Sequence, residues 1–216
     1  MKRLILFSLM ALSLSSLNAQ TFWDSQRPDR AVTFGLRAGL SSSKQYATDY
    51  HADQDAVLGF QAGVAVDLNI VRSFSVNTGL LLVKRGWENT YSDARGTLET
   101  TDNAMYLELP LLASYRVPLS DQAEFQLNAG PYFAYGIGGK RKTTNSFQVG
   151  GNYDIDSFDD AQGCKRFDCG MQVGVAFTFL HFYAGVCYER GLVNTWQQNG
   201  YEYQNGAIAL NVGYNF

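Results

Sequence analysis

The chain has 216 residues, of which 17 are Lys or Arg and 20 are Asp or Glu, and its formal net charge is −3 at pH 7. An acidic balance argues against a nucleic-acid partner, because nucleic-acid-binding domains present basic surfaces. The mean hydropathy is −0.17, and no long apolar run follows residue 19, which excludes a helical membrane protein with spans of about 20 apolar residues.

The N-terminus has the features of an export signal. Lys2 and Arg3 precede an apolar stretch at 4–14, and Leu17-Asn18-Ala19 forms a small-residue cleavage site before Gln20. We therefore expect residues 1–19 to be a cleaved signal peptide and 20–30 to be a periplasmic segment. Residues 31–216 are then one domain.

Alternating apolar and polar residues predict about eight β-strands. A period of two places the two sets on opposite faces of a sheet, and each segment is near the ~9–11 residues that a tilted spanning strand needs. In the last segment, for example, Ile208, Leu210 and Val212 alternate with Ala209 and Asn211. The segments are 32–41, 58–69, 74–82, 107–116, 124–135, 166–179, 182–189 and 207–216.

The charged residues of these segments all fall on the polar faces. A charge that faces lipid at mid-depth costs roughly 2–4 kcal/mol, so the partition predicts an up-and-down antiparallel transmembrane β-barrel with a lipid-facing apolar exterior. The alternative is a soluble lipocalin-like barrel with its apolar face inside. Glycines on the polar faces, the aromatic residue Phe216 at the end of the last strand and the asymmetry of the connections favour the membrane barrel.

The connections alternate in length. Residues 69–73, 117–122 and 180–181 are short, whereas 42–55, 86–103, 138–164 and 191–204 are long and polar. In outer-membrane barrels the short turns are periplasmic and the long loops are outside. We expect loops 86–103 and 138–164 to meet a protein partner, and the second offers stacking and hydrogen-bonding groups at Asn145, Phe147, Tyr153 and Phe158.

The inward-facing charges are the first candidate site. Eight strands enclose a lumen that side chains nearly fill, and buried charges require partners. We expect an ionic network that plugs the barrel; the alternative is a narrow ion path lined by the same groups. The network comprises Arg37, Asp67, Glu108, Arg116, Glu124, Arg166, Asp168 and Glu189.

A second set of charges lies where strands emerge outside. Lys and Arg bind phosphate well, so we expect this set to contact lipopolysaccharide head groups. Its members are Lys84, Arg85, Lys140, Arg141, Lys142 and Lys165.

The exported chain has three cysteines, an odd number that cannot all pair in disulfides within one chain. Cys164 and Cys169 are close enough in sequence for a local disulfide in an oxidising compartment. Against this, alternation places Cys169 on the apolar face. Cys187 falls on the inner face, where we expect it to be a small apolar side chain that fills space in the lumen.

The sequence offers little for catalysis or metal binding. His51 is expected in the first long loop and His181 in a periplasmic turn, away from surface substrates, so we expect no enzyme. The acidic residues near 53–55 and 154–160 are missing the central Gly and closing Glu of a calcium loop. No cofactor or metal is expected.

Three short segments resemble the outer-membrane barrel family named for PorT, which is common in Bacteroidetes. They are Tyr106-Leu107-Glu108-Leu109-Pro110, the glycine-rich stretch 130–139, and Gly213-Tyr214-Asn215-Phe216. The resemblance implies an outer-membrane β-barrel whose last strand is recognised by the barrel-assembly machinery. The name-giving member is linked to protease secretion, but these motifs do not carry that role to this chain.

Together these patterns predict a non-enzymatic outer-membrane barrel with a plugged lumen and a structural or surface-interaction role. A small passive pore and an accessory part of a secretion or assembly machine are the alternatives.

Overall fold

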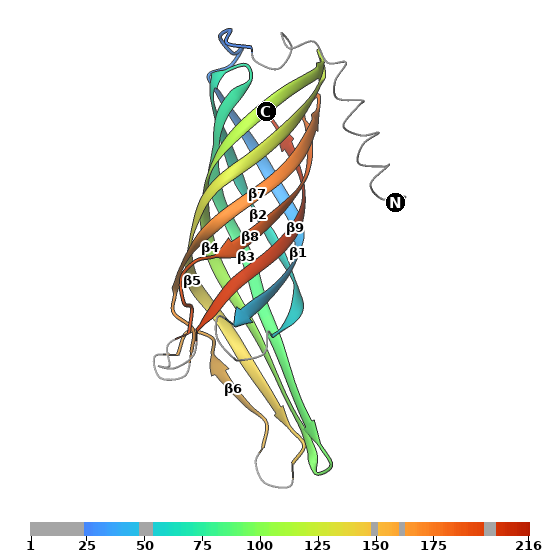
Figure 1. The fold of residues 1–216 in the computed structure, drawn as a ribbon, viewed down its shortest axis with the longest axis vertical. Coiled ribbons are helices and arrows are strands. Elements are labelled where there is room, and N and C mark those ends of the chain that lie inside the picture. The colour runs from blue at the N-terminus through green and yellow to red at the C-terminus, as the bar shows by residue number, and fades with distance from the viewer. Residues whose placement is uncertain (1–23, 48–53, 148–150, 160–162, 197–201) are drawn as a thin grey trace, which may run out of the picture.

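The computed structural model describes residues 24–47, 54–147, 151–159, 163–196 and 202–216. Within these ranges the chain forms an antiparallel β-barrel of eight ring strands, with one short strand outside the ring (Figure 1). The predicted fold class is confirmed. No helix in the described residues is long and apolar enough to cross a membrane. The predicted signal peptide at 1–19 lies outside them.

The ring follows chain order and closes where the last strand pairs with the first. β1 and β9 pair from Gly35 with Asn215 to Ala47 with Tyr203. The short strand β6 pairs only with the outer part of β5. The strands are β1 (Val32–Ala47), β2 (Asp55–Val71), β3 (Phe74–Asp93), β4 (Gly96–Ser120), β5 (Ala123–Asn145), β6 (Tyr153–Asp156), β7 (Phe167–Phe179), β8 (Phe182–Gly191) and β9 (Tyr203–Asn215).

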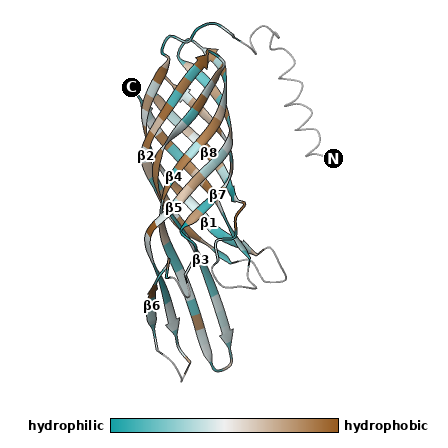
Figure 2. Ribbon diagram, turned by 90° about the vertical axis from the view of Figure 1, so that its left-hand side faces the viewer, coloured by the Kyte–Doolittle hydropathy of each residue, from teal (hydrophilic) through white to brown (hydrophobic). Residues whose placement is uncertain are grey.

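The alternation seen in the sequence places apolar residues outside and polar residues in the lumen. On β1, Leu36 and Leu40 are exposed, whereas Arg37 and Ser41 between them are buried. The hydrophobic segments therefore lie on the barrel wall, and the part of the molecule beyond the wall is more hydrophilic (Figure 2). This is the arrangement that a lipid-facing exterior requires.

The predicted loop at 86–103 is wrong, because β3 and β4 continue through it as a hairpin. The strands stay in register from Gly86 with Asn103 to Asp93 with Gly96. The hairpin extends well past the barrel mouth (Figure 1). Residues 97–101 include three threonines, which favour strands, and neither face of the extension needs the apolar pattern of a lipid-facing wall.

The predicted loop at 138–164 is also largely strand at its start. β5 runs on to Asn145, beside Leu98 of β4. Its pairing with β4 shifts where Tyr106 faces Gly136 and Met105 faces Gly138, so that Ile137 is an extra residue. Such a β-bulge exchanges the two faces of a strand. Even-numbered residues of β5 face inward up to Gly136, as buried Gln126 and Tyr132 show, and the odd-numbered Arg141 and Thr143 are buried beyond it.

The described part of the segment before β1 packs on the short β2–β3 turn. Ser73 Oγ accepts a hydrogen bond of 2.8 Å from the backbone N–H of Asp24. Arg72 of the same turn forms an ion pair with Asp29 at 3.2 Å. Residues 24–30 thus cover one side of the end where the short turns lie.

Candidate functional site

Arg85 of β3 lies at the centre of an ion cluster that crosses the lumen. Its Nη2 atom bonds Glu108 of β4 and lies 2.5 Å from Glu189 Oε2 of β8, and its Nη1 atom lies 3.2 Å from Asp168 Oδ2 of β7. In the ring order β8 stands opposite β3, so the guanidinium joins opposite walls. None of the four side chains is more than 3% exposed.

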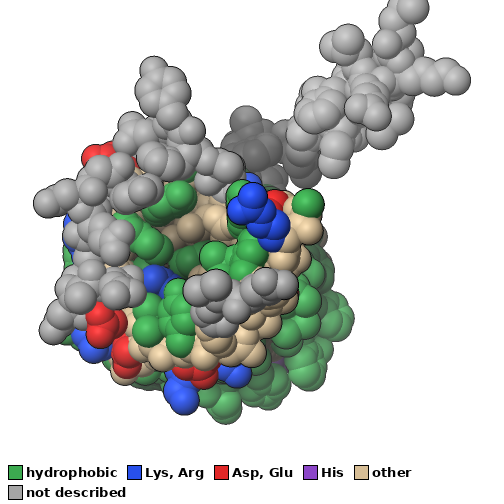
Figure 3. Space-filling view, turned by 90° about the horizontal axis from the view of Figure 1, so that it is seen from below, with side chains coloured by type: hydrophobic (Ala, Val, Ile, Leu, Met, Phe, Trp, Pro, Cys, Tyr) green, Lys and Arg blue, Asp and Glu red, His purple; other side chains and the backbone are tan. Residues whose placement is uncertain are grey.

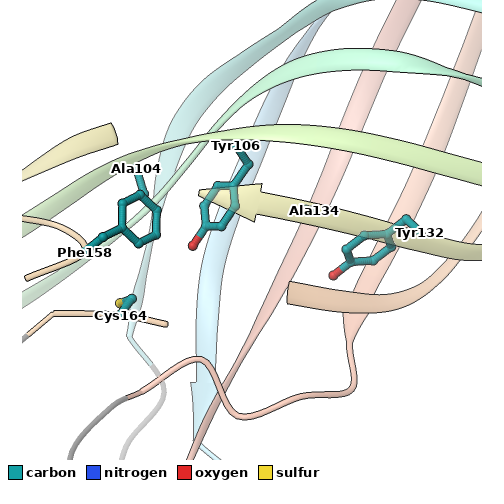
Figure 4. Close-up of a cluster of buried hydrophobic side chains, with 6 residues drawn as sticks. All are labelled: Ala104, Tyr106, Tyr132, Ala134, Phe158 and Cys164. Carbon is teal, nitrogen blue, oxygen red and sulfur yellow. The ribbon is translucent and has the colours of Figure 1, made fainter. Parts of the chain in front are cut away.

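Neutral donors complete this Arg85 cluster. Asn205 Nδ2 donates to Asp168 Oδ2 at 2.9 Å, and the Tyr132 hydroxyl lies 3.4 Å from the same oxygen. The Tyr132 ring also lies 4.8 Å from the Arg85 guanidinium carbon. Tyr132 and Tyr106 both project from the wall into the barrel (Figure 4). Because one guanidinium faces three carboxyl groups, these additional partners are needed to stabilise the acids.

A second ion cluster lies nearer the short turns. Arg116 pairs with Asp67 at 3.0 Å and with Glu124 at 3.7 Å. Arg37 also lies in the lumen, with its guanidinium carbon 3.9 Å from the centre of the Tyr183 ring. The Tyr183 ring thus joins Arg37 of β1 to β8, two strands away in the ring, by a cation–π contact.

One cavity in the described lumen is small. A cavity of about 50 Å³ is lined by lumen-facing groups that include Arg37, Gln61, Asn77 and Asn211. A water molecule needs roughly 10–15 Å³ of such volume. The cavity therefore has room for a few waters, and it is much smaller than the ~300 Å³ of a small ligand site.

The segment after β6 folds back over the lumen instead of standing out in solvent. Ser157 Oγ donates to Asp102 at 2.5 Å, and Asp102 also pairs with Arg141 at 2.9 Å. Phe158 packs edge-on against Tyr106, with ring centres 5.4 Å apart (Figure 4). We call residues 157–158 together with 163–164 the cap. Phe158, predicted to be available to a partner, is instead buried in the cap, because the smallness of Gly136 leaves space for its ring.

Cys164 of the cap is buried and lies in no disulfide, so the predicted pairing with Cys169 is wrong. Cys169 lies on β7 among outward-facing residues, whereas Cys164 lies inside, 3.3 Å from Arg141 Nη2. The alternation of β7 turns Cys169 outward, whereas the cap places Cys164 inside, so the two side chains lie on different sides of the wall. Burial raises the pKa of the Cys164 thiol to about 12, and the nearby Asp102 carboxylate also raises it.

Most of the predicted lumen charges lie where alternation places them. Arg37, Asp67, Glu108, Asp168 and Glu189 are buried, and Arg116 and Glu124 are partly buried. Arg166 is the exception, because it is exposed one residue before β7 begins. Its guanidinium lies over the outer side of Phe158 at 5.2 Å and donates to the Gly136 carbonyl at 3.1 Å.

Two of the six predicted lipopolysaccharide contacts are wrong. Arg85 and Arg141 are buried in ion clusters, so they cannot reach lipid phosphates. Lys140, Lys142 and Lys165 are exposed, and Lys84 is partly exposed. Continuing the alternation of 75, 77 and 79 along β3 would have placed Arg85 inside. The inward position of Arg141 could not be predicted in this way, because the bulge at Ile137 changes which residues of β5 face the lumen.

The one histidine among the described residues packs against an aromatic ring. His181 stacks on Tyr214 at 5.4 Å, and His51 lies outside the described residues. No group of three or more His, Cys, Asp or Glu side chains in the described ranges could hold a metal ion.

The sequence and fold can now be compared with known proteins. The family model described as outer membrane protein beta-barrel domain matches residues 18–197. The chain belongs to this family. Membership places it in the bacterial outer membrane, with the short turns on the periplasmic side and the barrel mouth outside. None of the curated proteins matches the chain.

Several solved outer-membrane barrels are similar to the chain in fold. The attachment invasion locus protein Ail of Yersinia pestis is 13% identical, with 87% of this chain and 100% of Ail covered and a TM-score of 0.44. Neisserial surface protein A is 12% identical, with 87% and 100% covered and a TM-score of 0.41. OprG of Pseudomonas aeruginosa is 11% identical, with 90% and 99% covered and a TM-score of 0.41.

Proposed function

We propose that this protein is a non-enzymatic, non-conducting outer-membrane barrel that displays a rigid β-sheet surface to a protein partner outside the cell. The barrel anchors the molecule, and the ion clusters and the cap close its lumen. The extended parts of β3, β4 and β5, with β6 at their edge, form the display surface.

The Arg85 cluster carries this proposal. A conducting pore requires a continuous water path, but Arg85 joins opposite walls at the level where Glu108, Asp168 and Glu189 converge. Phe158 and Cys164 cover the same lumen from the mouth side. Breaking a buried ion pair typically costs 3–5 kcal/mol, so thermal motion does not open this path readily.

The extended strands supply a surface with fixed shape. β4 pairs with β5 as far as Leu98 with Asn145, and β6 adds a further strand at Lys140 to Thr143. A paired sheet binds without the cost of ordering a flexible loop. Tyr153 of β6 is 53% exposed and offers an aromatic group for a partner.

Three further partners and signals belong to the proposal. Lys84, Lys140, Lys142 and Lys165 contact lipopolysaccharide phosphates, the final strand ending at Phe216 is read by the barrel-assembly machinery, and residues 1–19 direct export. Tyr106 and Glu108 of the segment that resembles the PorT family are both buried in the lumen. The PorT-type assignment of this segment is part of the proposal, without a role in secretion.

Site-specific photo-crosslinking in living cells tests the display surface. A photoreactive phenylalanine replaces Tyr153 or Lys142, and the control replaces Leu119, which is exposed near a periplasmic turn. We expect a protein adduct of discrete mass from Tyr153 or Lys142 and not from Leu119. A folded barrel that yields no adduct from either display position contradicts the proposal. An adduct only from Leu119 supports instead an accessory role in a periplasmic assembly.

A further inference from the structure

A concave aromatic pocket lies outside the lumen, on the continuation of the lumen-facing side of the β3–β4 hairpin. It has a volume of about 280 Å³. Seen from the mouth side, hydrophobic side chains gather around the hollow end of the barrel (Figure 3). The pocket is lined by Gln54, Trp87, Asn89, Tyr91, Leu98, Thr100, Trp196 and Tyr203.

The aromatic part of the pocket is built as a fixed platform. The Trp196 ring lies 5.9 Å from Trp87 and 5.6 Å from Tyr203. The Arg141 guanidinium lies 5.0 Å from the Trp87 ring and 4.7 Å from the Trp196 ring, and Asp102 holds it in place. The two indoles are therefore held by a buried cation, and a ligand does not have to order them.

The backbone beside Trp196 is fixed as well. The Asn194 side-chain oxygen accepts hydrogen bonds from the N–H groups of Trp196 and Tyr203, at 2.9 and 3.2 Å. Thr195 is fully buried, and its hydroxyl accepts a bond of 3.3 Å from Gln45 Nε2. This network holds the Trp196 side of the pocket in position.

Among the described residues, two polar atoms of pocket-lining side chains lack a hydrogen-bond partner. Within the part of the chain that the structure describes, Trp87 Nε1 and Gln54 Oε1 are buried without a hydrogen-bond partner. The two side chains are only 5% and 6% exposed. An unpaired buried donor or acceptor costs about 1–3 kcal/mol. Asn89 and Thr100, paired across the hairpin, add amide and hydroxyl groups at the pocket wall.

We propose that this pocket binds a neutral saccharide unit from outside the cell. Sugar rings combine an apolar C–H face with hydroxyl groups at the edge, which matches a lining of aromatic rings beside amide and hydroxyl side chains. The lining contains no Lys, Arg, Asp or Glu, so a neutral sugar fits better than a sulfated or acidic one. The volume is at the lower end of small-ligand sites, ~300 Å³, and accommodates a terminal sugar or disaccharide.

A glycan array probed with the purified, folded barrel tests the inference. The barrel is kept in an amine-oxide detergent, because detergents with sugar head groups would compete for the pocket. We expect binding to neutral hexose or N-acetylhexosamine glycans, with competition by the matching free sugar. The absence of any bound neutral glycan, or binding only to sulfated or acidic glycans, overturns the inference.

Substitutions in the pocket test whether the glycan binds there. Asn89→Ala and Trp196→Ala should each weaken binding about tenfold, which corresponds to losing one stacking or hydrogen-bonding group. Asn89 is exposed, so its substitution leaves the fold intact; Thr90→Ala, on the opposite face of the same strand, is the matched control and should bind normally. Equal binding by Asn89→Ala and Thr90→Ala overturns the inference. The array uses no protein partner, so the crosslinking result can fail while this one succeeds.

Discussion

At the scale of single residues, the ion cluster in the lumen is asymmetric, because one cation is shared by three acids. Arg85 bonds three acids, whereas Glu108 shares its cation with Asp168 and Glu189. Removing the common partner of a buried cluster leaves several uncompensated charges, and removing one of several acids leaves the cation still paired. The two kinds of substitution therefore have different expected costs.

Arg85→Gln should destabilise the barrel more than Glu108→Gln. We expect the first to lose about 3–5 kcal/mol and the second clearly less, because two carboxylates still bind Arg85. The temperature at which the folded band converts to the unfolded band on a gel measures this. Lys142→Gln, at an exposed position, should match the unmodified protein. A larger loss for Glu108→Gln would show that Arg85 is not the centre of the cluster.

The Cys164 thiol should resist alkylation while the cap is closed. With a pKa of about 12, the thiol is protonated through the physiological range, and only about one molecule in ten thousand carries the reactive thiolate at pH 8. The ionised fraction rises about tenfold for each unit of pH, so labelling should accelerate between pH 8 and 10. Cys164→Ser removes the slow reaction and identifies it. Rapid labelling of Cys164 at pH 7 would contradict a closed cap.

At the scale of elements, the bulge at Ile137 decides how the mouth is built. It turns Arg141 inward and leaves Gly136 facing Phe158 of the cap. An added Cβ at Gly136 would lie only 2.1 Å from Phe158 Cζ, whereas one at Gly138 meets open space. The two glycines on either side of the bulge thus form a matched pair for a test.

Gly136→Ala should displace the cap, and Gly138→Ala should not. Overpacking of this kind costs about 1–3 kcal/mol, and we expect Cys164 to be alkylated faster in Gly136→Ala because Phe158 moves. Gel conversion temperature and the labelling rate of Cys164 are the two readouts. Identical behaviour of the two variants would mean that Phe158 does not pack on Gly136.

The barrel strands were predictable, and the mouth was not. The alternation of apolar and polar residues predicted the eight ring strands, because lipid on one side imposes a strict period of two. It also predicted correctly that Asp67, Glu108, Asp168 and Glu189 are buried in the lumen. Beyond the membrane this constraint ends, so the extension of β3 and β4 resembled polar loops. Lys84-Arg85 resembled a basic rim pair although its two side chains point to opposite faces. The bulge reversed the faces of β5 at Arg141, and Phe158 filled space that only the fold creates.

At the scale of the whole molecule, two parts of the barrel have different tasks. The membrane part carries apolar residues outside and closed ion clusters inside. Beyond it, β3, β4 and β5 extend past the barrel mouth (Figure 1), and residues of β3 and β4 there line part of the aromatic pocket. The same inward face of β3 serves both parts, with Arg85 in the lumen and Trp87, Asn89 and Tyr91 outside it. The central claim is that the first part is sealed.

Single-channel recording in planar lipid bilayers tests that claim most directly. The unmodified barrel, with folding verified by its faster gel migration before boiling, should insert without producing conductance steps. Arg85→Gln, if it stays folded, should leak more than the unmodified protein, since its lumen loses the bridge between opposite walls. Stable, reproducible conductance steps from the unmodified protein would contradict the account and establish a passive pore in its place.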